Sequence, residues 1–209
     1  MEELFNQVRL EVYLDQIKRN IQSDINNYTE THIATLDIEA VVEQLFTKHS
    51  LRFPIIKEED IETNIRTKLF YGHELPSGTP FNLGAQYPVD IATFLIPFSG
   101  NRELFRCIPT RLVGGIEAAT ISEGRILIEL TDWGKLVGND KALKKIQDEF
   151  AKRFKNIQDN LASLKTETDT FFESLKPIIG KYLTDRVTYV KLKIESSGKL
   201  NPFNKKNKE

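Results

Sequence analysis

The stretch that decides the fold is Asp140–Tyr182, DKALKKIQDEFAKRFKNIQDNLASLKTETDTFFESLKPIIGKY. Its apolar residues recur at alternating steps of three and four, with one place where two steps of four adjoin, and this spacing is typical of one face of a supercoiled α-helix. The stripe comprises Leu143, Ile146, Phe150, Phe154, Ile157, Leu161, Leu164, Thr168 as a weak position, Phe171, Leu175, Ile178 and Tyr182. A helix with one apolar face requires a surface to pack against, which the rest of the chain is expected to supply.

Length and composition are those of a soluble globular protein. The chain has 209 residues, of which 40% are hydrophobic and 28% are charged, and this suits one domain with a real core. Its 29 Lys and Arg against 30 Asp and Glu give a net charge of -1, which argues against a chain built as a whole for nucleic acid. The single cysteine, Cys107, excludes an intrachain disulfide and fits a reducing compartment. We find no signal peptide and no apolar run of the roughly 18 residues that a membrane span needs, so we expect a cytoplasmic protein.

Two amphipathic helices are predicted before residue 50. Apolar residues from Phe5 to Tyr28 fall at helical steps, which predicts a helix over 3–28. Asp37 then offers an N-cap for a second helix over 38–49. Residues 1–50 are therefore expected to form a helical pair.

The period changes from helical to two at Ile61. Ile61–Leu69 alternates apolar or Thr residues with polar ones, which predicts a half-buried strand with a charged outer face. Val89–Phe98 is the most apolar strand, and we expect Leu104–Ile108 to pair with it across the turn at 99–102. Ile116–Ile121 and Arg125–Thr131 are expected to form another hairpin, with Ile126, Ile128 and Leu130 on one face.

These elements predict an α+β fold with a single domain over 1–190. An antiparallel meander of four to five strands over 61–132 would pack against the N-terminal helices and the long helix of 140–190. Asn139 or Asp140 would cap that helix, and Pro177 would kink or break it because proline lacks a backbone donor. Residues 191–209 are expected to be a flexible, polar, basic tail.

No catalytic, metal or cofactor signature stands out. The acidic cluster Glu58, Glu59, Asp60 and Glu62 is typical of a solvated edge. The long loop over 71–88 carries His73, Glu74 and Ser77, but no second histidine stands at metal-ligand spacing.

A metal-dependent nuclease remains the enzymatic alternative. Pro88 and Asp90 resemble the start of a Pro-Asp…(Asp/Glu)-x-Lys metal site, in which carboxylates hold the metal and orient a water. The sequence contains no Glu-x-Lys or Asp-x-Lys to complete it. We therefore expect no enzyme activity and no cofactor.

The outer face of the long helix carries a local group of cations: Lys141, Lys144, Lys145, Lys152, Arg153 and Lys155. Such a group is usually a solvated helix face, and no aromatic residues interleave with it as they do in stacking platforms for single strands. A non-catalytic nucleic-acid-binding module is therefore a further alternative, supported by this patch and opposed by the overall charge.

One short motif carries a resemblance to a known class of module. The string IPFSGNRELF at 96–105, with Pro109 after it, resembles a hallmark of an uncharacterised accessory module of bacterial anti-phage systems. Arg186 and Leu200-Asn201-Pro202 resemble the ending of that module, although the paired Arg-Arg and the Leu-Gly before the final Pro are missing. The resemblance implies a non-catalytic accessory role and carries no catalytic residues.

A protein-interaction, sensing or regulatory role is thus the favoured prediction. The long helix would outreach a small sheet, since ~1.5 Å per residue makes it longer than strands of ~20 Å. We expect part of its stripe to bind another protein or a second copy, through Phe171, Phe172, Leu175 and Ile178. The alternative is that residues 189–203 bury Phe171 and Phe172 within the chain.

Overall fold

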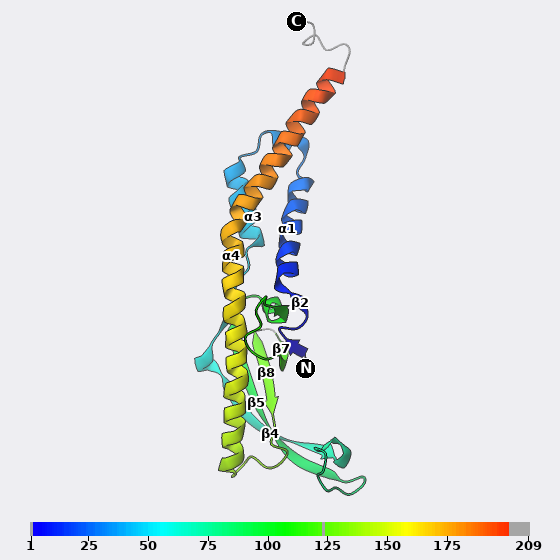
Figure 1. The fold of residues 1–209 in the computed structure, drawn as a ribbon, viewed down its shortest axis with the longest axis vertical. Coiled ribbons are helices and arrows are strands. Elements are labelled where there is room, and N and C mark those ends of the chain that lie inside the picture. Colours follow the sequence, from blue (N-terminus) through cyan, green and yellow to red (C-terminus); the bar gives the residue numbers. More distant parts are fainter. Residues whose placement is uncertain (1, 123, 201–209) are drawn as a thin grey trace. The chain divides into compact units, whose positions relative to one another are not determined.

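The computed structural model describes residues 2–122 and 124–200, and the chain divides into two compact units (Figure 1). Unit 1 combines the N-terminal strands up to Leu10 with Leu51–Lys165, and unit 2 combines Glu11–Ser50 with the chain from Thr166 onward. The sequence predicted one domain over the same part of the chain. The long helix α4, Asp140–Leu200, contributes to both units.

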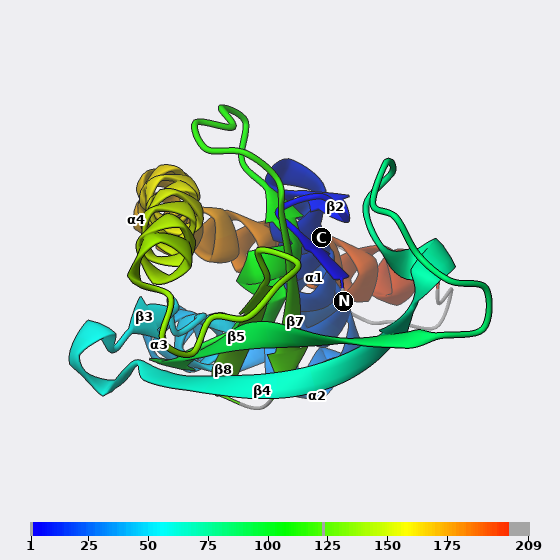
Figure 2. The same cartoon turned by 90° about the horizontal axis from the view of Figure 1, so that it is seen from below.

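Unit 1 is built on an antiparallel sheet, as the sequence predicted (Figure 2). The strand order is β1-β7-β8-β5-β3, and β4 also pairs with β5, on the edge that β3 occupies. Two short strands, β2 and β6, pair in parallel beside it. The strands are β1 Glu2–Leu4, β2 Val8–Arg9, β3 Ile55–Ile56, β4 Glu62–Tyr71, β5 Gln86–Ser99, β6 Cys107–Ile108, β7 Glu117–Ser122 and β8 Arg125–Leu130.

The first part of α4 packs on one face of this sheet. Asn139 caps the helix as predicted, since its Oδ1 accepts a hydrogen bond of 3.1 Å from the backbone N–H of Ala142. The Phe150 ring then stacks on that of Phe94 in β5, with centroids 3.9 Å apart. Ile126 and Ile128 are fully buried and Leu130 is buried on the same face of β8, which confirms the predicted facing of the strand.

The helical stripe is confirmed over most of its length. The stripe residues from Ile146 to Leu175 are buried apart from the half-buried Phe150, and Thr168 is buried with them. Beyond Leu175 the buried residues are Ile179, Leu183 and Val190, whereas the predicted Ile178 and Tyr182 are half-buried. Successive steps of four turn the buried face by about 40° each, because one residue advances a helix by about 100°.

The predicted hairpin between Val89–Phe98 and Leu104–Ile108 is wrong. A 3₁₀-helix, η3 at Arg102–Arg106, follows β5, and β6 pairs with β2 instead. The Oδ1 of Asn101 caps η3 by accepting a 2.9 Å hydrogen bond from the N–H of Glu103. Leu104 and Phe105 are both fully buried, which suits a helical turn because successive strand residues point to opposite faces.

The N-terminal helix begins later than predicted. Residues 2–9 form β1 and β2, and Phe5 between them is buried with a φ of 59°. Helix α1 spans Leu10–Asn27. Ile17, Ile21 and Ile25 are buried as expected, whereas Val12 is exposed.

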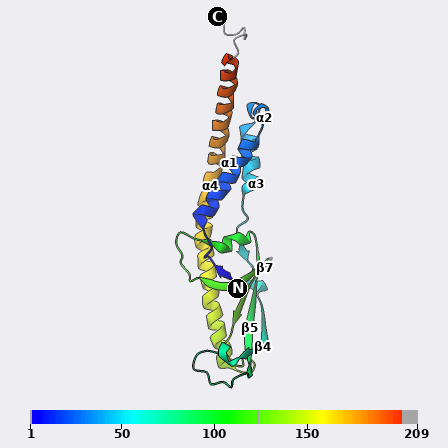
Figure 3. The ribbon, with the colours of Figure 1, turned by 90° about the vertical axis from the view of Figure 1, so that its right-hand side faces the viewer.

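Unit 2 is helical: α1, α2 at Glu30–Ala34, α3 at Ile38–His49 and the α4 residues after 165 (Figure 3). Asp37 caps α3 as predicted, by accepting a 3.2 Å hydrogen bond from the N–H of Ala40. Phe46 of α3 meets Phe172 edge to face at 6.3 Å between centroids. The N-terminal helices therefore belong with the later part of α4, where the sequence predicted them as a cover for the sheet.

The end of α4 also differs from the expectation. The helix runs through Pro177 without a break and continues to Leu200, so residues 191–200 are helical where a flexible tail was predicted. The rest of that tail, and Asn201 and Pro202 of the resemblance, lie outside the described residues. Among the helices that the structure describes, none combines the length and the apolar composition of a membrane-spanning segment.

Strand β4 forms as predicted but is not half-buried. Nine of its ten residues are exposed and one is half-buried. The alternation of its sequence does set its faces, because Thr67 points to the same side of the sheet as its partner Asp90 and donates to that carboxylate at 2.7 Å. Period-two alternation predicts which residues share a face, and it does not predict that another element will cover that face.

Candidate functional site

The segment 109–116, PTRLVGGI, links β6 to β7 and is fastened to α4 within unit 1; we call it the 109–116 loop. Its main anchor is Asn160 of α4, whose exposed fraction is 0%. Asn160 Oδ1 accepts hydrogen bonds from the backbone N–H of Val113 at 3.2 Å and of Gly114 at 3.0 Å, and its Nδ2 donates to the Gly115 carbonyl at 3.3 Å. The Asn160 side chain thus satisfies backbone N–H and C=O groups of the loop that would pair with a neighbouring strand in a sheet.

Two further contacts fix the loop at each side of Asn160. Ser163 Oγ donates to the Arg111 carbonyl at 3.0 Å. Gly114 lies directly on the α4 backbone, where a Cβ would stand 2.5 Å from the Asn156 carbonyl oxygen. Any larger residue at position 114 would lift the loop off the helix.

The start of β7 is held by the same face of α4. Asn156 Nδ2 donates to Glu117 Oε1 at 2.7 Å, and Arg153 Nε lies 3.8 Å from Glu117 Oε2. Glu117 is buried, so these two side chains compensate for its loss of hydration. A polar row of α4, Arg153, Asn156, Asn160 and Ser163, therefore serves one loop and the strand after it.

Sequence reasoning missed this row, although it has a signal. Its members follow each other at steps of three, four and three, which is the step of the apolar stripe. Each stands one position before a stripe residue, as Asn160 stands before Leu161. Amides at helical period beside an apolar stripe indicate a second, polar contact face.

The loop carries its apolar side chains into solvent. The exposed fractions are 41% for Leu112, 56% for Val113 and 46% for Ile116, and the Arg111 side chain is exposed beside them. The loop therefore combines a backbone held by hydrogen bonds to α4 with exposed apolar side chains.

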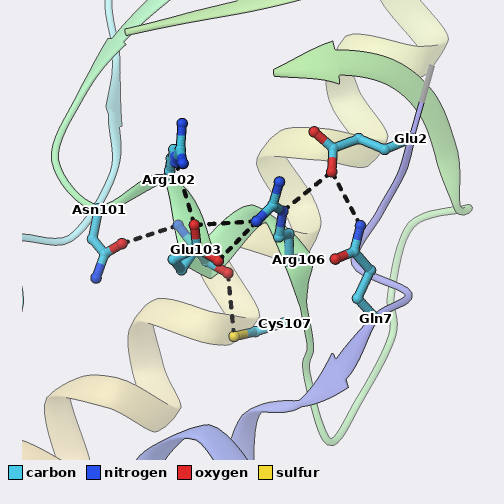
Figure 4. A network of polar contacts seen from close by, with 7 residues as sticks. All are labelled: Glu2, Gln7, Asn101, Arg102, Glu103, Arg106 and Cys107. Carbon is cyan, nitrogen blue, oxygen red and sulfur yellow. Dashed lines mark hydrogen bonds and ion pairs between the residues drawn. The ribbon is translucent and has the colours of Figure 1, made fainter. Parts of the chain in front are cut away.

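The string at 96–105 that carries the resemblance has a structural role in unit 1 (Figure 4). Arg106 donates from Nε to Glu2 Oε2 at 3.1 Å and from Nη1 to Glu103 Oε2 at 3.1 Å, and so ties η3 to β1. Cys107 Sγ donates to the Glu103 carbonyl at 3.4 Å. Burial raises the pKa of the Cys107 thiol to about 12, which keeps it protonated and unreactive at neutral pH.

Carboxylates neutralise most of the predicted basic patch. Lys144 pairs with Asp148 at 2.9 Å, Arg153 with Glu149 at 2.8 Å and Lys155 with Asp159 at 3.1 Å, and Lys145 pairs with Asp132. Of the six cations, Lys141 and Lys152 have no ion pair within the described parts of the chain. All except Lys155 line a groove of about 1130 Å³ whose walls also carry four carboxylates: Glu129, Asp132, Asp148 and Glu149. This mixed charge does not favour a phosphate backbone.

The candidate interface on α4 lies inside unit 2. Phe171 and Leu175 are buried, Phe172 packs on Phe46, and Ile178 is half-buried. The first two are thus unavailable to a partner in this structure. Residues of α1 and α3 contact this part of the stripe: Lys18 of α1 stands 5.6 Å from the centre of the Phe171 ring, and Phe46 of α3 packs on Phe172. The alternative prediction had named residues 189–203 as the cover.

Asp90 is engaged by the fold. It is buried, and its carboxylate accepts hydrogen bonds from Thr67 Oγ1 at 2.7 Å and from the backbone N–H of Leu136 at 2.8 Å. These hydrogen bonds tie the Asp90 carboxylate to β4 and to the segment before α4. No three His, Cys, Asp or Glu side chains group as metal ligands within 2–122 and 124–200. In the 71–88 loop, where the sequence predicted no site, Glu74 caps the end of β4 by accepting from the Tyr71 N–H at 2.7 Å, and His73 stacks on the Tyr71 ring.

We expect Asp90→Asn to destabilise the protein in a pH-dependent way. The hydrogen bond from Thr67, followed by that from Leu136, holds the pKa of Asp90 below its ordinary value of 3.8. A depressed carboxyl pKa stabilises the fold above the unfolded pKa, and this contribution is lost as pH falls through the folded pKa. Thermal melts should therefore show a lower Tm for the variant at pH 7 and a difference that shrinks below pH 3.8.

Asp148→Asn, which removes an exposed carboxylate of α4, is the matched control. It should leave the melting temperature nearly unchanged at every pH, because exposed ion pairs contribute little. A Tm difference for Asp90→Asn that stays constant down to pH 2 would contradict the role of its charge.

Comparison of the chain with protein-family models, curated proteins and solved structures gave no match. The functional conclusion therefore rests on the geometry of the chain's own residues, and the feature that this geometry singles out is the 109–116 loop.

Proposed function

We propose that this chain is a non-catalytic protein-binding component whose contact surface includes the 109–116 loop. One observation carries the proposal: a fully buried amide, Asn160, makes hydrogen bonds to Val113, Gly114 and Gly115 and thereby fixes a loop that exposes apolar side chains. Leu112 and Val113 are adjacent exposed apolar residues on this loop, and contiguous exposed apolar surface is a feature of protein contact sites.

The physical advantage of this arrangement is entropic. A flexible loop loses conformational entropy when a partner orders it, and that loss weakens binding. The contacts of Asn160, Ser163 and Gly114 remove this loss before the partner arrives. Arg111 adds a residue type that is enriched among interface hot spots.

The resemblance of the 96–105 string supports a biological setting for this function. We propose a sensing or regulatory component of a prokaryotic anti-phage system that works in the cytoplasm. The string itself builds the core of unit 1 through Phe98, Leu104 and Phe105, which are buried, and so the contact to a partner is assigned to the loop.

A photo-crosslinking residue in place of Val113 is expected to capture a discrete partner in cells that produce the protein. The same residue in place of Leu83 is the matched control, because Leu83 is 97% exposed and lies in the loop between β4 and β5. Mass spectrometry of the products should identify a partner at position 113 that is absent at position 83.

Leu112→Ser added to the Val113 probe should weaken that capture, because it removes an exposed apolar side chain without touching the backbone anchors. Equal products from positions 113 and 83, or products that Leu112→Ser leaves unchanged, would contradict the proposal. Metal-dependent cleavage of DNA or RNA that Asp90→Ala abolishes would favour the nuclease alternative instead.

A further inference from the structure

Strand β4 lies at one border of the sheet of unit 1, opposite the border formed by β1 (Figure 2). Its ten residues pair with β5 from Glu62↔Leu95 to Tyr71↔Gln86. On its other side β4 has no strand partner among the residues that the structure describes. An edge strand presents unpaired N–H and C=O groups to any strand that can lie beside it.

The two faces of β4 differ in chemistry. Ile65 and Leu69 lie on the side of Thr67, with exposed fractions of 38% and 55%. Glu62, Arg66 and Lys68 lie on the opposite side, because successive side chains of a strand alternate. A strand that pairs with this border thus meets one apolar row and one charged row.

The charged row contains two side chains that the chain leaves without an ion pair. Arg66 pairs with Glu129 of β8. Glu62 and Lys68 have no oppositely charged partner within 2–122 and 124–200, and the Lys68 ammonium stands over the Phe70 ring at 4.7 Å. The row therefore offers one free acid and one free base, six positions apart.

We propose that a second copy of this chain pairs with β4, antiparallel, with the two-fold axis at Ile65. In that register residues whose numbers add to 130 face each other, so Glu62 stands opposite Lys68 of the partner copy, and Lys68 opposite its Glu62. Ile65 faces its own copy on the apolar row. Opposite charges directly across a strand pair stabilise it.

The remaining pairs in this register also match. Thr63 meets Thr67 and Asn64 meets Arg66, all of them residues of β4. An axis at Arg66 would set Arg66 against itself, and an axis at Thr67 would set Arg66 against Lys68, and like charges across a strand pair are unfavourable. An axis at Asn64 places Glu62 opposite Arg66, which already pairs with Glu129 of β8. It leaves Lys68 opposite Asp60, which lies in the 3₁₀-helix η1 (Glu58–Asp60) and not in a strand.

The pairing is an isologous interface of modest size. Stable dimers commonly bury about 800 Å² per partner, and a single edge strand offers less than that. The dimer is therefore expected to form and dissociate with protein concentration. The inference deepens the protein-binding function and rests on it, yet it uses a surface other than the 109–116 loop.

A charge exchange at positions 62 and 68 tests the pairing by sedimentation equilibrium of the full chain. Wild-type protein should dimerise with rising concentration. Glu62→Lys alone places lysines opposite each other, and Lys68→Glu alone places glutamates opposite each other, so each variant should dimerise at least tenfold more weakly. An equimolar mixture of the two should recover a heterodimer, because both pairs between positions 62 and 68 are then opposite in charge.

The mixture is the decisive sample. A wild type that stays monomeric at the highest soluble concentration, or a mixture no more dimeric than its components, would overturn the proposal. Circular dichroism melts of both variants provide the check on folding, and the exposed positions of Glu62 and Lys68 predict unchanged melting temperatures.

Cysteine crosslinking tests the register. Ile65→Cys should form an interchain disulfide on mild oxidation, since facing residues of antiparallel strands have Cα atoms about 4.5–5.5 Å apart, within disulfide reach. Thr63→Cys should not, because the two copies of residue 63 would be four positions apart, roughly 13 Å. Crosslinking of Thr63→Cys in place of Ile65→Cys would overturn the register.

The two proposals fail separately. A monomeric wild type that still captures a partner through position 113 overturns the dimer alone. A dimer that survives while capture at position 113 is no stronger than at position 83 overturns the loop function alone.

Discussion

Replacing Ile157 with aspartate is expected to unfold the protein at room temperature. Ile157 is 0% exposed at the centre of the α4 stripe in unit 1. An unpaired charge at a buried position costs about 3–5 kcal/mol, and the lost apolar burial adds to this. The free energy of unfolding of natural domains is about 5–15 kcal/mol, so this substitution removes a large part of the folding stability.

Ala151→Asp is the control for helix propensity and added charge, because Ala151 is exposed on the same helix. Its melt should stay within a few degrees of wild type, whereas Ile157→Asp should show little cooperative transition by circular dichroism. Melts of the two variants that coincide would show that the stripe is not a packing surface.

Gly100→Ala adds only one methyl group, yet we expect it to cause a large loss of folding stability. Gly100 has a φ of 99°, and a Cβ there would stand 2.4 Å from the Phe53 carbonyl oxygen. The left-handed conformation alone costs a residue with a Cβ about 1–2 kcal/mol. The clash adds to it, because the atom in the way is backbone and has no rotamer to change.

Gly138→Ala separates these two effects. Gly138 has a φ of 76°, but no atom lies within 4 Å of the Cβ position. It should lose only the conformational part, about 1–2 kcal/mol, and urea titrations should place Gly100→Ala well below it in stability. Equal losses would mean that the turn at Gly100 shifts freely away from Phe53.

The local features of the fold were predictable from sequence. The stripe from Ile146 to Leu175 depends only on helical period, and the caps at Asp37 and Asn139 depend on side chains next to the first helical turn. The facing of Ile126 depends on strand alternation in the same way. Each of these follows from residues within a few positions of one another.

The features that were missed depend on contacts distant in sequence. Residues 2–9 have helical spacing, but β1 and β2 form because β7 and β6 offer them edges more than ninety residues away. Val12 is exposed because the buried stripe of α1 begins with Leu10 and Leu14, and Val12 lies about 200° around the helix from Leu10. Local pattern competes poorly with such tertiary pairing.

The candidate site was missed because neither the α4 residue nor the loop residues that form it have a distinctive sequence pattern on their own. Asn160 looks like a solvated helix residue, and Leu112 and Val113 look like a short strand. Only the folded chain brings the amide within 3.2 Å of the Val113 N–H. Phe171 of the predicted interface is buried for the opposite reason, because the helices that contact this part of α4 come from the other end of the sequence.

Alkylation of the single thiol, Cys107, can be used to measure local unfolding of the protein. Its burial beside η3 leaves it inaccessible to alkylating reagents while β2 and β6 stay paired. Modification must wait for a transient opening that exposes and deprotonates it. The rate of alkylation therefore measures how often this part of unit 1 opens, with no label introduced.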